Sequence, residues 1–227
     1  MSRSLSQEDC HQSPDVNALI VASHWLSGLF SAPLSQQQVI DARTAPGQDG
    51  LRWIGAQLDA TATADTLCRT LAQDTVDNLT VRLQRNYTAL FEGIFADRSV
   101  LPYESAWQDQ QHATLGGVAV VEMNILLRNL DMHISADCCE PADHLAIELA
   151  ALATALDSGH NNIAQDLLRR LRDWTPAFSQ ALQRQDPNGL YALAGQLLLA
   201  LTHAASITLM PTMPVMASVN QHPQGEC

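Results

Sequence analysis

Apolar residues recur every three or four positions along most of this chain, and that spacing limits the folds it can adopt. One such run, residues 74–95, holds Val76, Leu79, Leu83, Tyr87, Leu90 and Ile94. This spacing places side chains on one face of an α-helix. No long stretch shows the alternation of apolar and polar residues that is typical of strands. The chain is therefore predicted to be all-α, with roughly nine or ten helices.

Start and stop signals divide this pattern into segments. Ser35 and Ser13-Pro14 are typical of helix starts. Residues 45–50 contain a proline and two glycines and predict a turn, and residues 186–189 predict another. Residues 97–109 are expected to form a loop. We expect helices at residues 15–30, 35–43, 51–58, 61–73, 74–95, 115–132, 140–156, 161–185 and 190–210.

Composition also indicates how the chain is divided. Residues 1–13 and 211–227 are predicted to be disordered tails. A polar connector at residues 133–139 separates an N-terminal helical part, residues 14–132, from a C-terminal helical part, residues 140–210. The fold is thus a single helical domain, or two helical subdomains joined by a hinge at the connector.

The charge balance excludes some classes of partner. The chain has 227 residues, 12 of them basic and 24 acidic, which gives a net charge of −12. A nucleic-acid binder or a protein anchored on an anionic membrane needs a basic surface instead. The balance suits a soluble protein, and it would suit one that captures a basic peptide. Residues 190–210 are apolar enough to span a bilayer, but polar residues such as Gln196 and His203 interrupt them, which favours a buried core helix.

The five cysteines indicate neither a disulfide framework nor a zinc site, because their number is odd and no pair has the CxxC spacing. A reducing cytoplasm is the expected compartment. Cys138 and Cys139 are adjacent, and adjacent cysteines do not easily meet disulfide geometry. We expect them to pack at the edge of the core rather than to act as a redox switch or a metal site.

Three polar residues crowd the start of the helix that follows these cysteines. Pro141 is suited to the first helical position, and Glu140 and Asp143 place negative charge at the positive end of the helix dipole. His144 comes next. This pattern fits a capped helix with a satisfied histidine, and it also fits a functional site.

Motifs of catalysis are missing. The sequence contains no GxxxxGK[ST], HExxH or GxSxG, and its single ExxH match lies at residues 8–11. Asp143 and His144 could be imagined as a hydrolytic or metal cluster with Glu140. Adjacent residues on a helix point in different directions, however, and cannot grip one ion together. We therefore expect neither an enzyme nor a metal site.

Residues 140–147, with the sequence EPADHLAI, resemble the signature of the TorD/DmsD family of cytoplasmic chaperones of exported molybdoenzymes. Two further stretches, residues 101–107 and 189–199, resemble the TorD branch more than the DmsD branch. Tyr87, Leu90 and Phe91 match a family pattern of an aromatic residue followed by Leu-Phe, with a tyrosine where DmsD has a tryptophan.

The resemblance implies a chaperone that binds the twin-arginine signal peptide and the apoprotein of a molybdoenzyme, of the trimethylamine N-oxide or dimethyl sulfoxide reductase type. It assists insertion of the molybdenum cofactor and delays export. An assembly scaffold of the NarJ kind, which reads no signal peptide, and a helical hydrolase are the alternatives. The signal peptide needs carboxylates beside apolar surface. The residues expected to bind it are Glu140, Asp143, His144, Glu104, Tyr87, Leu90, Phe91, Pro102, Tyr103 and Trp107.

The roles and partners follow from the same resemblance. The three acids would supply charge, the aromatic residues and Leu90 apolar surface, and His144 would orient Asp143 or bind the peptide. No cofactor is expected, apart from weak binding of guanine nucleotide. Cofactor-biosynthesis proteins are further possible partners. The protein is expected as a monomer or as a homodimer that exchanges the C-terminal part across the hinge.

Overall fold

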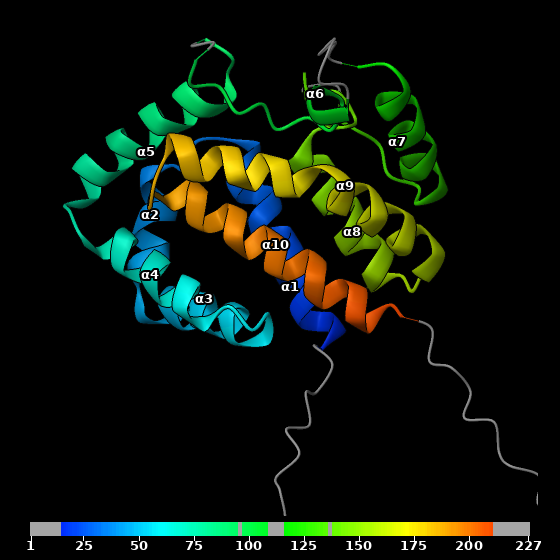
Figure 1. Ribbon diagram of the computed structural model, residues 1–227. Helices are drawn as coiled ribbons and strands as arrows, with labels where there is room; N and C mark the ends of the chain where they lie inside the picture. Colours follow the sequence, from blue (N-terminus) through cyan, green and yellow to red (C-terminus); the bar gives the residue numbers. More distant parts are fainter. Residues whose placement is uncertain (1–14, 95–96, 109–115, 136–137, 211–227) are drawn as a thin grey trace, which may run out of the picture.

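The computed structural model describes residues 15–94, 97–108, 116–135 and 138–210 (Figure 1). Within these residues the chain forms helices and no named strand, which confirms the all-α prediction. Both predicted tails, residues 1–13 and 211–227, lie outside the described residues. The helices are α1 (Val16–Ser31), α2 (Gln36–Arg43), α3 (Ala45–Gln57), α4 (Thr61–Ala72), α5 (Val76–Phe91), α6 (Ser105–Gln108), α7 (Val118–Asn129), α8 (Leu145–Asp157), α9 (Asn161–Gln185) and α10 (Leu190–Thr208).

Local signals account for several helix boundaries. Ser35 caps α2 in a capping box, in which its side chain and that of Gln38 each accept a backbone hydrogen bond. The turn predicted at residues 45–50 is wrong, because these residues begin α3. The Thr44 side chain caps this helix, and a proline in the first turn lacks an N–H group that would have no intrahelical partner. Gly47 is needed for close packing, since a Cβ there would lie 2.2 Å from Asp41 O.

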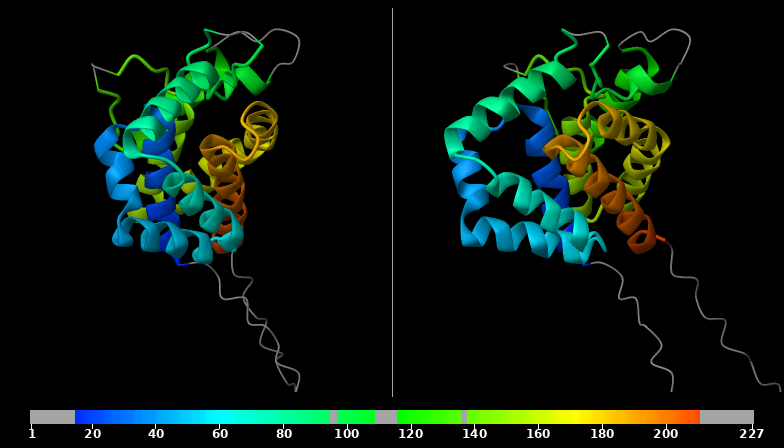
Figure 2. Two further views of the ribbon diagram at one scale, coloured as in Figure 1. Left: turned by 90° about the vertical axis from the view of Figure 1, so that its left-hand side faces the viewer. Right: turned by 60° about the vertical axis from the view of Figure 1, so that its left-hand side comes forward.

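Four helices form the centre of the molecule. α1 packs along α8, α8 against α9, α9 against α10, and α10 back against α1. Helices α2 to α5 cover one side of this bundle. Helices α6 and α7 lie on the other side, where α6 packs against α9 (Figure 1, Figure 2). Because α1 belongs to the predicted N-terminal part and α8 to α10 to the C-terminal part, one hydrophobic core joins the two parts.

Aromatic rings fill the middle of this core. Phe30 from α1, Phe91 from α5 and Phe178 from α9 meet there, with ring centroids 5.7 to 6.4 Å apart. Tyr191, near the start of α10, packs edge-on against Phe91 with centroids 5.0 Å apart. Such pairs add a little to the stability gained from burying the rings alone. The cluster ties α5 to the bundle beside the residues of the candidate site.

Helix α10 lies in this core. Among the described residues, it is the one helix long and apolar enough to cross a membrane by length and composition. Of its most apolar window, 67% is buried inside the protein, against α1, α4 and α9. This burial agrees with the predicted core helix.

Candidate functional site

The motif residues 140–144 precede helix α8 as a turn. His144 N donates to Pro141 O at 3.0 Å, and α8 begins only at Leu145. The prediction that Pro141 is the first helical residue is therefore wrong. The His144 ring caps the helix instead, because its Nδ1 accepts a hydrogen bond from Ala146 N at 3.1 Å. This bond satisfies one of the amide groups that a helix start leaves without an intrahelical partner.

The turn pairs with the second family-like stretch, residues 101–107. An antiparallel β-bridge joins Tyr103 to His144, and next to it Leu145 N donates to Pro102 O at 2.8 Å. Successive side chains of extended segments point to opposite sides. The paired segments therefore present one set of side chains to a groove and the other to the interior.

Glu104 and Asp143 face the interior. Glu104 N donates to Asp143 O at 3.0 Å, and Ser105 N donates to Asp143 Oδ2 at 3.0 Å. Asp143 is fully buried, and its Oδ1 has no hydrogen-bond partner within the described part of the chain. The two acids were expected to meet a peptide; the structure places them behind the groove.

Arg170 of α9 holds Glu104 in place. The two side chains form an ion pair and are 5% and 3% exposed. Arg170 also donates to Glu122 Oε2 at 2.5 Å and to Ala119 O at 3.0 Å, both on α7. A buried charge needs a partner of this kind, because its transfer from water is otherwise costly. This arginine therefore links α7 and α9 to the segment that carries Tyr103.

Glu148 of α8 lies beside this ion pair and is fully buried. Its Oε2 accepts a hydrogen bond from Trp174 Nε1 at 3.3 Å, and its Oε1 has no hydrogen-bond partner among the described residues. Burial raises the pKa of Glu148 well above its usual range; the charge of Glu104 adds to this rise, and Arg170 opposes it. Burial also raises the pKa of Glu104, against the effect of Arg170. Burial thus favours the protonated form of Glu148.

On the other side, Tyr103 and His144 line a groove of about 620 Å³, completed by the ends of α1 and α5. Tyr103 Oη donates to Glu140 Oε2 at 2.6 Å. Burial, together with this hydrogen bond, raises the pKa of Tyr103, so the phenol keeps its proton at neutral pH. Among the residues that the structure describes, Glu140 and Glu92 are the two carboxylates that line the groove, and no arginine lines it.

The His144 ring has a defined protonation state. Burial lowers its pKa, and the nearby Glu140 and Asp143 oppose this effect. Because Nδ1 accepts a backbone hydrogen bond, the neutral ring carries its proton on Nε2. His144 therefore offers an N–H donor, rather than a charge, to any ligand in the groove.

The structure brings together only part of the predicted site. The residues that line the groove are Tyr87, Phe91, Pro102, Tyr103, Glu140 and His144. The residues that do not line it are Leu90, Glu104, Trp107 and Asp143. Tyr87 and Phe91 are only 6% and 4% exposed, so they offer an edge of the aromatic core rather than a broad apolar surface. Their assignment to peptide binding stays a prediction.

Glu92 is a groove residue that the sequence reasoning missed. It is the C-cap of α5, next to Phe91. A negative charge is unfavourable at the negative end of a helix dipole. An acid at that position, directly after the family-like Leu-Phe pair, does not stabilise the helix and therefore indicates a role in binding.

The two adjacent cysteines do not pack against the core. Cys138 and Cys139 are both free and exposed, so the expectation that they act as small core residues is wrong. Cys138 lines a small hollow of about 250 Å³ that His133 also lines. Within the described parts of the chain, no group of three or more His, Cys, Asp or Glu residues is arranged to hold a metal ion.

The helical bundle and its acidic groove describe a class of all-α protein with a hollow that can hold a ligand. Comparisons with known proteins identify the family. The sequence model of the family described as nitrate reductase delta subunit matches residues 56–185. Chaperone protein TorD from Escherichia coli O45:K1 is 32% identical over 189 residues, which cover 78% of this chain and 89% of the relative. TorD from Shigella dysenteriae serotype 1 is 31% identical with the same coverage.

A solved structure has a similar fold. A candidate redox enzyme maturation protein from Archaeoglobus fulgidus matches with a TM-score of 0.50, over 87% of this chain and 98% of that chain, at 19% identity. The chain therefore belongs to the nitrate reductase delta subunit family, in which the TorD chaperones are its relatives. This confirms the resemblance that was carried by the motif and the two other stretches.

Proposed function

We propose that this protein is a cytoplasmic chaperone that binds the twin-arginine signal peptide of an exported molybdoenzyme in the groove beside His144. It holds the apoprotein while the molybdenum cofactor is inserted and delays export until then. The observation that carries the proposal is that Glu140 and His144 of the motif meet Pro102 and Tyr103 of the second family-like stretch in one groove. The likeness to the TorD chaperones supports it.

The chemistry of the groove fits the charged part of such a peptide. A guanidinium group forms short, charge-assisted hydrogen bonds with a carboxylate, and Glu140 and Glu92 supply two carboxylates without a competing arginine. The hydrogen bond from Tyr103 Oη to Glu140 Oε2 fixes the orientation of that carboxylate. His144 Nε2 would donate to a main-chain carbonyl of the peptide. All of these are binding interactions, so the proposed mechanism is capture and release rather than turnover.

Calorimetry with a synthetic twin-arginine signal peptide tests the proposal. Glu140→Gln keeps the shape of the side chain and removes its charge. Loss of one charge-assisted contact costs about 1.5–3 kcal/mol, so the dissociation constant should rise about 10- to 150-fold. Asp157→Asn is the matched control, because it removes one acid at the exposed far end of α8. Equal affinities of Glu140→Gln and the unmodified protein would contradict the site.

The family match favours one alternative function. The matching model is described as nitrate reductase delta subunit, which suggests an assembly scaffold that reads no signal peptide. Such a scaffold would retain an apoprotein whose signal peptide has been deleted and would show no affinity for the isolated peptide. The same calorimetry, combined with a pull-down of the truncated apoprotein, separates the two functions.

A further inference from the structure

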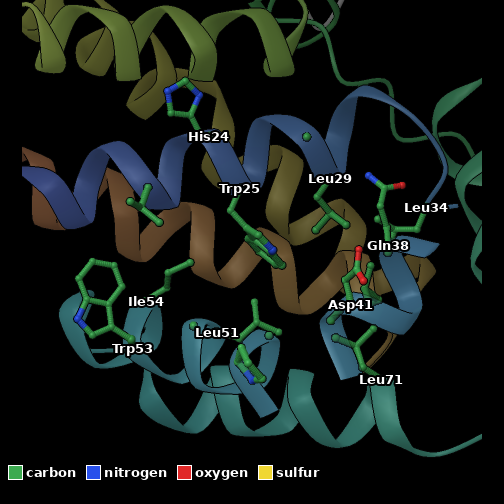
Figure 3. Close-up of a pocket in the computed structure, with 17 residues that line it drawn as sticks. His24, Trp25, Leu29, Leu34, Gln38, Asp41, Leu51, Trp53, Ile54 and Leu71 are labelled. Atoms are coloured by element: carbon green, nitrogen blue, oxygen red, sulfur yellow. The ribbon is translucent and has the colours of Figure 1, made fainter. Parts of the chain in front are cut away.

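A second groove lies between α1 and the pair α2–α3, on the other side of the α1–α2 connection. Its volume is about 500 Å³. Figure 3 shows Trp25 and Leu29 extending from α1 toward α3, where Leu51 and Ile54 face them. Trp53 of α3, 41% exposed, lies at one end of the groove. A tryptophan that remains this exposed beside an apolar hollow is available to a ligand.

The lining of this second groove is mostly apolar. Within the described parts of the chain, Asp41 and His24 are its ionisable residues, and no arginine lines it. Gly28 of α1 also lines the groove, and a Cβ built on it would meet no atom within 4 Å. A glycine with open space above it, inside a helix, leaves room that an apolar side chain of a ligand can fill.

The two grooves meet at the α1–α2 connection. Pro33 lines the acidic groove and Leu34 lines the apolar one. Adjacent residues lie 3.8 Å apart along the chain, so an extended peptide can pass from one groove to the other within a few residues. The acidic groove contains Glu92 and Glu140, whereas the apolar groove contains Trp25 and the half-exposed Trp53.

We infer that the apolar groove binds the apolar run of the signal peptide, while the acidic groove binds its arginine pair. This inference rests on the proposed function. The order of the chemistry carries it, because an acidic hollow beside a mostly apolar hollow, which no described arginine lines, matches a peptide in which guanidinium groups are followed by an apolar run. The protein thus reads the two parts of the peptide on the two sides of the α1–α2 connection.

The test is a cycle of two peptides and two protein variants, measured by calorimetry. One peptide is the twin-arginine signal peptide, and in the other serines replace the apolar run. Gly28→Leu fills the second groove with a side chain that has space to stand there. It should raise the dissociation constant of the intact peptide by about tenfold or more, which is the order expected for displacing one buried apolar side chain. The serine peptide should bind Gly28→Leu and the unmodified protein equally.

Ala56→Leu is the matched control, because it adds the same side chain at an exposed position of α3 outside the groove. It should leave both affinities unchanged. Trp53→Ala tests the same groove by removing the indole ring. It should lower the affinity for the intact peptide and leave that for the serine peptide unchanged. Circular dichroism and the Tm of each variant verify that it is folded. The two variants act by opposite changes in volume, so a folding defect in one does not remove the test.

The outcomes separate this inference from the proposed function. If neither peptide binds the unmodified protein, the proposed function fails. If the intact peptide binds and Gly28→Leu and Trp53→Ala leave its affinity unchanged, the second groove is not its site and the inference is overturned. If the variants instead impair only the retention of the signal-peptide-deleted apoprotein, the groove binds the apoprotein. If they impair only self-association seen by light scattering, the groove binds a second copy of the chain. Either result would overturn the inference.

Discussion

Replacing Arg170 by methionine should destabilise the protein more than any other single change behind the groove. The guanidinium neutralises Glu104, which is 2% exposed, and also binds Glu122 and Ala119 O. Methionine keeps the apolar stem and removes the charge and the hydrogen bonds. Among the described side chains, Glu104 would then keep the hydrogen bond from Gln108 Nε2 but no cationic partner.

The magnitude follows from the burial of both partners. Removing one member of a buried ion pair costs about 3–5 kcal/mol, because the other is left as an uncompensated charge. Typical domains have only about 5–15 kcal/mol of unfolding free energy in total. For a chain of this size the loss corresponds to a fall in Tm of about 6–20 °C. Part of the loss should disappear as the pH is lowered, because Glu104, whose pKa burial raises, then takes up a proton.

Urea and thermal unfolding, followed by circular dichroism, measure this loss. Glu122→Gln is the control, since its side chain is 55% exposed and its bond to Arg170 should contribute less than about 1 kcal/mol. The double variant Arg170→Met/Glu104→Gln should recover much of the stability, because no unpaired buried charge remains. If Arg170→Met cost no more than Glu122→Gln, the buried pair would not be the link between α9 and the Tyr103 segment.

Two further predictions concern the proton in this network and the exposed cysteines. The folded-state pKa of Glu148 is raised, so the native state binds the extra proton above pH 4.5 and its stability should fall as pH rises through that window, by at most about 1.4 kcal/mol per pH unit for this group. Glu148→Gln cannot lose a proton, and its Tm should fall less as the pH is raised above 4.5; parallel curves for the two proteins would refute this. Cys138→Ser/Cys139→Ser should keep peptide affinity within about threefold, a difference below 1.4 kcal/mol, and a dependence on added oxidant in the unmodified protein alone would show a redox switch instead.

The helical class could be predicted from the sequence because it depends on local spacing. Helix α9 begins and ends at the predicted residues, Asn161 and Gln185. The prediction was wrong at residues 45–50 because proline and glycine are turn-formers on average but have other uses in a first helical turn. Gly47 is required there by the approach of Asp41 O, a contact between two helices that no local pattern shows.

The candidate site was harder to predict because its geometry depends on pairing between distant segments. Pro141 has the chemistry of a first helical residue, yet the bond from Leu145 N to Pro102 O and the cap from His144 start the helix four residues later. Once the segment is a turn beside an extended strand-like stretch, adjacent residues divide between two faces. The sequence pointed to two stretches that the fold pairs, but it could not show that Tyr103 faces the groove while Glu104 faces Arg170.

This division decides which substitutions can test the binding of a peptide. Asp143 is fully buried and accepts a hydrogen bond from Ser105 N, so Asp143→Asn acts on the segment that carries Tyr103 before it acts on any ligand. A loss of peptide affinity in that variant should therefore be accompanied by a lower Tm. Glu140 lines the groove and is only partly buried, so Glu140→Gln should lower affinity without that change. Only the second pattern reports a direct contact between the protein and an arginine of the peptide.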